Sequence, residues 1–299
     1  MELRHLRYFV AVAETGSFTQ AATQRLHTAQ PSLSRQIRDL ETELGAQLII
    51  RGPRAMELTP AGRVFLDHAR VILLQVEAAR AAARRAAQPA RTPFVVGFLT
   101  GYEMEWLPII MQALGDELQT TELTMHSASS PELTQGLLSG KIDVAFLRPD
   151  PAAHGLMFKV LTNEDLVALL PANHRLARRK SIRVDDIADE PFVNFSRAYA
   201  PALRQVIDAW LADAGLHPVA VQEAETLPMV ISLALSSGGV SLLPGYMQGL
   251  LPPAVVSRRL HGRAPTIALA AGYVAANMSP VLQRVLAGAE AFVARVARG

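Results

Sequence analysis

"HTAQPSLSRQIRDLE" (residues 27–41) is the stretch that decides the fold of the N-terminal part of this 299-residue chain. At 100° per residue, its aliphatic side chains share one face of a helix: Leu33, Ile37, Leu40 and, one turn later, Leu44. The opposite face is polar and cationic and holds Pro31, Ser32, Arg35, Arg38 and Thr42, with Ser34 on its flank. Proline costs little in the first helical turn, because the N–H that it lacks has no partner there. The pattern leaves two interpretations open: a solvated surface helix, or a helix whose cationic end enters an acidic partner.

The segments on either side favour the second interpretation. An apolar stripe predicts a helix from Leu3 that ends at Gly16, and residues 17–26 form a second short helix with Ser17 or Thr19 as its cap. Short β runs at 48–51 and 56–59 flank a Gly-Pro turn. Two helices joined by the tight "HTA" connection and followed by a β wing form the helix-turn-helix layout, in which the second helix enters the DNA major groove N-terminus first.

Charge is divided unevenly along the chain. Residues 1–91 hold 13 Lys/Arg and 8 Asp/Glu, a net +5, while the remainder is net −3. Gln30, Ser34 and Arg35 carry groups suited to base edges, and Arg38 suits a phosphate. The turn from Arg51 to Arg54 would reach the DNA backbone or minor groove. We therefore expect double-stranded DNA as the partner of this part of the chain.

A long helix follows the wing. Thr59 and Pro60 provide a cap and a first helical residue, and the pattern continues to about Gln88 with apolar residues every three or four positions. Such a helix would be about 40 Å long and needs a partner to cover its stripe, so we interpret it as a dimerisation helix. Packing against its own domain is the alternative. The segment "AAQPARTP" (86–93) reads as a linker.

Beyond the linker, short apolar β runs alternate with helical patterns. The runs lie at 94–99, 122–127, 143–148, 166–171, 191–196, 219–224, 239–244 and 266–274. Such alternation predicts a mostly parallel sheet with helices on both faces, as one large domain or two smaller ones.

Several functional classes are disfavoured by what the sequence lacks. It contains no cysteine, which excludes disulfides and thiolate chemistry. No phosphate-binding loop, dinucleotide fingerprint, nucleophile elbow or paired metal-binding histidines occur, so neither an enzyme nor a cofactor is expected. Glu14 interrupts the first apolar run, so we expect no signal peptide, no membrane association and a cytoplasmic protein. A solute-binding protein, the third hypothesis, fits poorly with the basic N-terminal domain.

About 66 N-terminal residues closely resemble the LysR-type transcriptional regulators. The resemblance rests on "LRHLRYFVAVAETGSFTQAA" (3–22), "QPSLSRQIRDLE" (30–41), "LGAQLIIR" (44–51) and "LTPAGRVFL" (58–66). It implies an α-helical winged helix-turn-helix plus a long linker helix, followed by an α/β two-subdomain effector domain like a periplasmic binding protein. The implied domains are 1–59 for DNA binding, 60–90 for the linker helix, 91–162 with 265–299 for subdomain I, and 163–264 for subdomain II. It also implies a homodimer or homotetramer that acts with RNA polymerase.

The resemblance assigns site residues as well. The DNA-binding set is Gln30, Pro31, Ser32, Ser34, Arg35, Arg38, Arg51 and Arg54. Ala29 stands where members often have a capping serine, and Thr28 is expected to replace it. The effector-binding set, at strand ends and helix starts, is Thr100, Gly101, Ser129, Ser130, Arg148, Phe195, Ser196, Tyr199 and Thr226.

The chemistry of the effector is expected to follow from these residues. Arg148 beside hydroxyl groups would suit a carboxylate, although a salt bridge that closes the cleft is the alternative for this residue. The proposed aromatic wall consists of Tyr102, Trp106, Phe146, Phe195 and Tyr199, each of which would otherwise belong to a core. "PTIALAAGYV" (265–274) and "PGYM" (244–247) are similar to members that activate the catabolism of aromatic compounds. The resemblance therefore implies an aromatic carboxylate.

Overall fold

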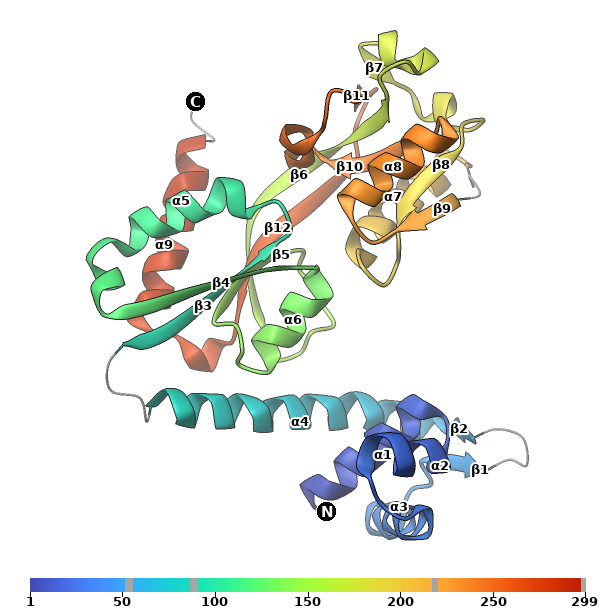
Figure 1. Cartoon of the computed structure of the whole chain (residues 1–299), viewed down its shortest axis with the longest axis vertical. Coiled ribbons are helices and arrows are strands. Elements are labelled where there is room, and N and C mark those ends of the chain that lie inside the picture. Colours follow the sequence, from blue (N-terminus) through green and yellow to red (C-terminus); the bar gives the residue numbers. More distant parts are fainter. Residues whose placement is uncertain (52–55, 87–90, 217–219, 297–299) are drawn as a thin grey trace. The chain divides into compact units, whose positions relative to one another are not determined.

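The computed structural model describes residues 1–51, 56–86, 91–216 and 220–296 (Figure 1). It divides into an N-terminal unit, which includes residues 1–84, and a larger unit, which includes residues 85–137 and 141–299. No helix among the described residues is long and apolar enough to cross a membrane.

Three helical segments open the N-terminal unit. α1 (Leu3–Thr15) ends at Gly16, which has φ +65°, and α2 (Phe18–Gln20) continues as a π-helical turn, η1 (Ala21–Leu26). The hydroxyl of Ser17 accepts the N–H of Gln20 at 3.4 Å, so Ser17 rather than Thr19 caps the second helix.

The quoted stretch forms α3 (Gln30–Leu44). Leu33, Ile37 and Leu40 are fully buried against residues of α1 and η1, as the periodicity predicts, whereas Leu44 is 37% exposed. The expected cap is wrong. Ala29 occupies the cap position and no side chain bonds there, so Thr28 does not replace the missing serine.

The wing and the long helix are held to α3 by short-range contacts. β1 (Ile49–Arg51) pairs antiparallel with β2 (Met56–Leu58). The Glu41 carboxylate accepts the N–H groups of Leu48 at 2.8 Å and Ile49 at 2.9 Å, which ties β1 to the end of α3. The Thr59 hydroxyl caps α4 (Pro60–Ala86), and a Cβ on Gly62 would lie 2.1 Å from the Leu48 carbonyl oxygen. Only glycine therefore permits this approach.

A first lobe opens the larger unit. β3 (Thr92–Leu99) lies between β4 (Thr121–Ala128) and β5 (Val144–Leu147), and all three are parallel. Helices α5 (Glu103–Leu114) and α9 (Pro280–Val296) cover one face and α6 (Ser130–Leu138) covers the other (Figure 1). Alternate residues of β5 accordingly enter two cores, Val144 and Phe146 on the α5 side and Ala145 and Leu147 on the α6 side.

Two long antiparallel strands continue the sheet. The first half of β6 (Met157–Pro171) pairs with β12 (Thr266–Tyr273), and its second half pairs with β10 (Ser241–Pro244) and β11 (Val255–Leu260). The prediction of a mostly parallel sheet is therefore wrong, since the sheet is mixed. The reason is that the chain leaves the first lobe along β6 and returns along β12 in the opposite direction.

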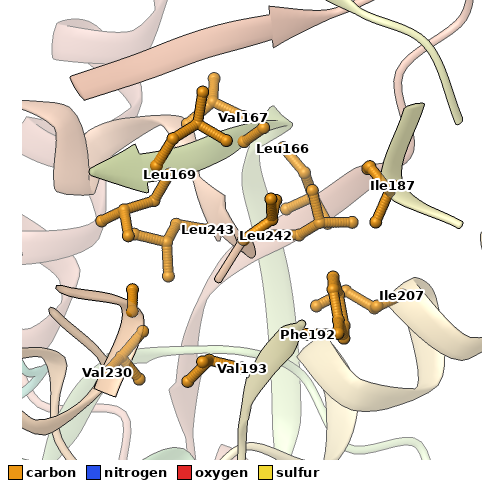
Figure 2. Close-up of a cluster of buried hydrophobic side chains, with 14 of the residues drawn as sticks. Leu166, Val167, Leu169, Ile187, Phe192, Val193, Ile207, Val230, Leu242 and Leu243 are labelled. Carbon is orange, nitrogen blue, oxygen red and sulfur yellow. The ribbon is translucent and has the colours of Figure 1, made fainter. Parts of the chain in front are cut away.

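A second lobe is built around the far half of β6. It contains β7 (Ser181–Ile182), the parallel pair β8 (Phe192–Phe195) and β9 (Ala220–Ala224), α7 (Pro201–Asp213) and α8 (Leu227–Ser237). Figure 2 shows its core, where Leu242 and Leu243 of β10 meet side chains from β6, β8 and the helices. Short helical turns complete the connections: η2 (Gly115–Gln119), η3 (Arg175–Arg178), η4 (Val184–Ile187), η5 (Gly245–Leu250) and η6 (Ala275–Asn277).

Candidate nucleic-acid interface and ligand cavity

The amino end of α3 presents an exposed polar surface. Gln30, Pro31, Ser32, Arg35 and Arg38 are all exposed on it. Ser34 differs, since it is only 8% exposed. The reason is helical geometry: Ser34 lies three positions before the fully buried Ile37 and so shares part of its face.

Backbone donors add to this surface. The first turn of any helix has N–H groups without intrahelical partners, and Ala29 offers no side-chain acceptor to them. Together with the positive end of the helix dipole, such N–H groups favour a phosphate. Arg51 ends β1, but its side chain is not described, and Arg54 lies outside the described residues.

A cavity of about 450 Å³ lies between the two lobes of the larger unit. Its walls are mostly apolar. They are formed by Leu99, Thr100, Gly101, Glu103, Met104, Ser130, Arg148, Phe195, Tyr199, Ala200, Pro201, Ala202, Leu203, Thr226, Leu227, Pro228, Pro244, Tyr246, Met247 and Leu250.

Besides α5, whose start is occupied by the carboxylate of Glu103, three helices begin at this cavity. Ser130 is the first residue of α6, residues 201–203 form the first turn of α7, and Leu227 and Pro228 open α8. They converge because β4, β8 and β9, the strands that precede these helices, direct their carboxyl ends toward the space between the lobes. Three positive dipole ends next to one apolar space favour a ligand with an anionic group.

The first turns of α6 and α8 are capped by side chains. The N–H and hydroxyl of Ser129 donate to the Glu132 carboxylate at 3.0 and 2.8 Å, and these bonds lower the pKa of Glu132. The Thr226 hydroxyl accepts the N–H of Met229 at 3.4 Å. At α7 the cap position is Ala200, which has no side-chain bond, so Ala202 and Leu203, which line the cavity, have N–H groups without a side-chain cap.

Arg148 lies at the end of β5 and is only 5% exposed. Its Nη2 donates to the Glu164 carboxylate at 2.8 Å and to the Tyr102 hydroxyl at 2.9 Å, and its Nη1 donates to the Ala268 carbonyl at 3.0 Å. Tyr102 in turn donates to Glu164. Burial raises the pKa of Tyr102 far above its usual range, so the phenol stays protonated. Arg148 thus forms the internal salt bridge that the sequence left open as its alternative role.

Tyr246 of η5 brings the second lobe against this cluster. Its ring stacks on Tyr102 with centroids 3.8 Å apart, and its hydroxyl donates to the Thr100 carbonyl at 2.9 Å. Gly101, with φ +98°, makes the approach possible, since a Cβ there would lie 2.8 Å from Leu250 Cδ1 and 3.0 Å from Tyr246 Cε2. Burial also raises the pKa of Tyr246 above its usual range.

Comparisons with known proteins agree on one family. Residues 3–63 match the bacterial regulatory helix-turn-helix of the lysR family, and residues 87–292 match the LysR substrate binding domain. The chain is 36% identical to the Hca operon transcriptional activator HcaR of Escherichia coli, over 96% of each protein. The chain belongs to the LysR family of transcriptional regulators.

Solved structures of the LysR family have the same fold. Full-length BenM, a regulator of Acinetobacter baylyi, is similar with a TM-score of 0.61 and 27% identity, covering 99% of this chain and 98% of BenM. CbnR in complex with its target DNA has a TM-score of 0.57 at 26% identity and covers 98% of this chain and 100% of CbnR. The expected winged helix-turn-helix with a two-lobed α/β domain is therefore confirmed, and the chain is a DNA-binding regulator rather than an enzyme.

Not all residues expected at the effector site of this LysR-family protein line the cavity. Those that do are Thr100, Gly101, Ser130, Arg148, Phe195, Tyr199 and Thr226. Ser129 is occupied in capping α6, and the Ser196 hydroxyl accepts the N–H of Tyr199 at 3.2 Å. Neither of these two serines contributes to the cavity wall as described.

Of the five aromatic residues expected to form a wall, only two line the cavity. Phe195 and Tyr199 line the cavity and stack with centroids 5.9 Å apart. Trp106 and Phe146 pack together in the first-lobe core at 5.0 Å, and Tyr102 lies behind Tyr246. Sequence reasoning missed Glu103 and Tyr246. The proline after "AYA" at 198–200 marks the start of α7, whose first turn also lines the cavity.

Proposed function

We propose that a small aromatic carboxylate, bound in the cavity between the lobes, controls the promoter binding of this regulator. The observation that carries the proposal is the convergence of three helix N-termini on one mainly apolar cavity. The apolar walls suit an aromatic ring, with the stacked pair Phe195 and Tyr199 on one side. The helix starts suit the carboxylate, and the hydroxyls of Thr100, Ser130 and Thr226 add hydrogen-bond donors.

Arg148 enters this proposal in a supporting role. It lines the cavity and adds positive charge near it, but its guanidinium is hydrogen-bonded to Ala268, Tyr102 and Glu164. Ser129 and Ser196 act through the helix start and the turn that they hold. The assignment of a regulatory role to the bound ligand also draws on the likeness to HcaR, which is named as an operon activator.

A comparison of benzoate with benzamide tests the effector proposal in the full-length protein. The two molecules have the same ring and differ in one charge. We expect benzoate to raise the thermal midpoint of unfolding, since a ligand at 100 times its Kd stabilises by about 2.7 kcal/mol, and benzamide to do so much less. Equal effects of the two compounds would contradict an anion site.

On the DNA side, we propose that α3 reads bases in the major groove with Gln30, Pro31, Ser32 and Arg35. Arg38 would contact phosphate, and Arg51 and Arg54 of the wing would contact the adjacent backbone. Ser34, although largely buried, would support the register of this turn. The domain limits given above, 1–59, 60–90, 91–162 with 265–299, and 163–264, are part of the same proposal.

We further propose that α4 pairs two subunits, as a homodimer or homotetramer that acts with RNA polymerase in the cytoplasm. Val64 is 61% exposed and Ile72 38%, and none of residues 70–80 is buried, which leaves an apolar stripe accessible. Ile72→Glu should shift the protein toward a smaller species in sedimentation velocity. An unchanged sedimentation coefficient would contradict pairing through this stripe.

A further inference from the structure

The positive side chain that lines the cavity is paired with a carboxylate, whereas the negative one has no ion-pair partner among the described residues. Among the described lining residues, only Arg148 and Glu103 are charged. Glu164 neutralises Arg148 at 2.8 Å, whereas Glu103 forms no ion pair with any cationic side chain in the described part of the chain. Taken together, the lining residues and Glu164 therefore carry one negative charge that no cation among them balances, and this charge belongs to Glu103.

Glu103 is fixed in position. It is the first residue of α5, where the helix dipole favours a carboxylate. Its Oε2 accepts the N–H of Gly101 at 2.8 Å, and its Oε1 accepts the Ser127 hydroxyl at 3.4 Å. These contacts hold the carboxylate at the first-lobe wall, while the starts of α7 and α8 belong to the second lobe.

A ligand therefore meets opposite electrostatics at the two walls. The helix starts attract one anionic group, and Glu103 repels another. A sphere of about 450 Å³ is only about 9.5 Å across, so the second carboxylate of a rigid dicarboxylate could not move far from Glu103. At that separation and an effective dielectric constant of about 20 to 40, two like charges reduce the affinity by roughly tenfold.

We propose that Glu103 is a specificity-determining residue that restricts this cavity to aromatic monocarboxylates and rejects dicarboxylates. This inference rests on the proposed binding of an aromatic carboxylate and adds the charge that the effector can carry. It makes Glu103, rather than any cation, the residue that distinguishes one effector from another.

Two isosteric probes test the inference by isothermal titration calorimetry on the full-length protein. Terephthalate and 4-carbamoylbenzoate have nearly the same shape, but only terephthalate carries a second charge. We expect the natural protein to bind 4-carbamoylbenzoate about tenfold more tightly than terephthalate. In Glu103→Gln, which keeps an acceptor for the Gly101 N–H, the two affinities should agree within about threefold. Glu122→Gln, an exposed position on β4 away from the cavity, is the matched control and should keep the tenfold difference.

The possible results separate the two levels of the argument. Equal affinities in the natural protein, or the same difference in Glu103→Gln as in the control, would overturn the role of Glu103 and leave the aromatic-acid site standing. If benzoate and both probes fail to bind, the aromatic-acid site is itself wrong, and the charge restriction falls with it. Unliganded unfolding midpoints within about 2 °C would show that the variants are folded.

Discussion

Glu164→Gln should destabilise the larger unit by about 2–3 kcal/mol, because it removes the charge that balances the buried Arg148. The side chains of Arg148 and Glu164 are 5% and 15% exposed, so solvent screens the pair weakly. Two unit charges about 4 Å apart attract by about 4 kcal/mol at an effective dielectric constant of about 20. A neutral glutamine costs less to desolvate than a carboxylate, which offsets part of the lost attraction. The glutamine oxygen also still accepts one hydrogen bond.

Other groups around Arg148 limit the loss. Its guanidinium carbon lies 5.3 Å from the Tyr102 ring centroid and 5.8 Å from that of Tyr246, and such cation–π contacts contribute about 0.5–1 kcal/mol each. The Ala268 carbonyl remains bound as well. The expected value therefore lies below the 3–5 kcal/mol typical of breaking a buried pair outright.

Urea unfolding followed by tryptophan fluorescence measures the effect. The chain has two tryptophans, Trp106 in the first lobe and Trp210 in α7 of the second, so the signal reports on the larger unit. The double variant Arg148→Met/Glu164→Leu removes both charges and should cost about 1 kcal/mol, less than Glu164→Gln alone. A loss below about 0.5 kcal/mol in Glu164→Gln, or a double variant that is less stable than the single one, would refute the reasoning.

Three further predictions concern helix ends. Arg35→Ala should weaken operator binding by about 1–3 kcal/mol and relax base preference at one position, whereas Arg38→Ala should weaken all sequences alike; equal binding of Arg35→Ala across an operator library would contradict base reading. Ala29→Ser should protect the amides of α3 in hydrogen exchange by about 0.5–1 kcal/mol, and unchanged protection would show that the uncapped end has another acceptor. Ser129→Ala should cost about 1 kcal/mol at pH 7 and less at pH 3: the bonds from the Ser129 N–H and hydroxyl lower the pKa of Glu132, so the hydroxyl contributes above the usual pKa of a glutamate and its contribution is lost as the pH falls through the folded value. An equal cost at both pH values in urea unfolding would contradict this.

The N-terminal unit could be predicted from the sequence because its signals are local. The 3.6-residue spacing of Leu33, Ile37 and Leu40 and the Thr59-Pro60 start are all read within one or two turns. The exceptions have local causes too. Ser34 is buried because a polar residue beside a buried stripe shares its face, and α3 begins without a cap because Ala29 has no side-chain acceptor and no neighbour supplies one.

The larger unit was predicted less completely, for a different physical reason. Only the second half of β6 was expected, since residues 157–165 mix exposed, half-buried and buried positions and include Lys159 and Glu164 among apolar residues. β11 was likewise not predicted, because its sequence "VVSRRL" (255–260) is too polar to resemble a buried strand. Strands that connect lobes are paired on both edges without being buried on both faces, so their composition does not show the continuous apolar run of a central parallel strand.

The cavity could not be located from single residues, because its character depends on which chain segments meet. Each helix start carries an ordinary signal, such as Pro201 for α7 or Thr226 for α8, but no spacing indicates that both meet Ser130 at one place. The same holds for Glu103 and Tyr246, which are 143 positions apart and line the same cavity. Their meeting follows from the pairing of β10 with β6, which places η5 at the junction of the lobes, and the sequence does not indicate this pairing.

The position of the effector carboxylate follows from comparing two binding places: Arg148, which is already paired, and the uncapped start of α7. Arg148 sits at the junction of the lobes, bonded to Glu164 on β6 and to Ala268 on β12. A ligand that took Arg148 away from Glu164 would leave the Glu164 carboxylate unpaired. Such a ligand would have to offset the 2–3 kcal/mol expected above for the loss of this ion pair before gaining any affinity. The N–H groups at the start of α7 involve no such competition, because no side chain caps them. We therefore expect Arg148→Met to alter stability more than benzoate affinity, whereas Ala202→Pro, which removes one of those N–H groups near the helix start where proline is tolerated, should weaken benzoate with little loss of stability. Calorimetry on the two variants decides the matter: a larger loss of benzoate affinity in Arg148→Met would place the carboxylate on the arginine instead.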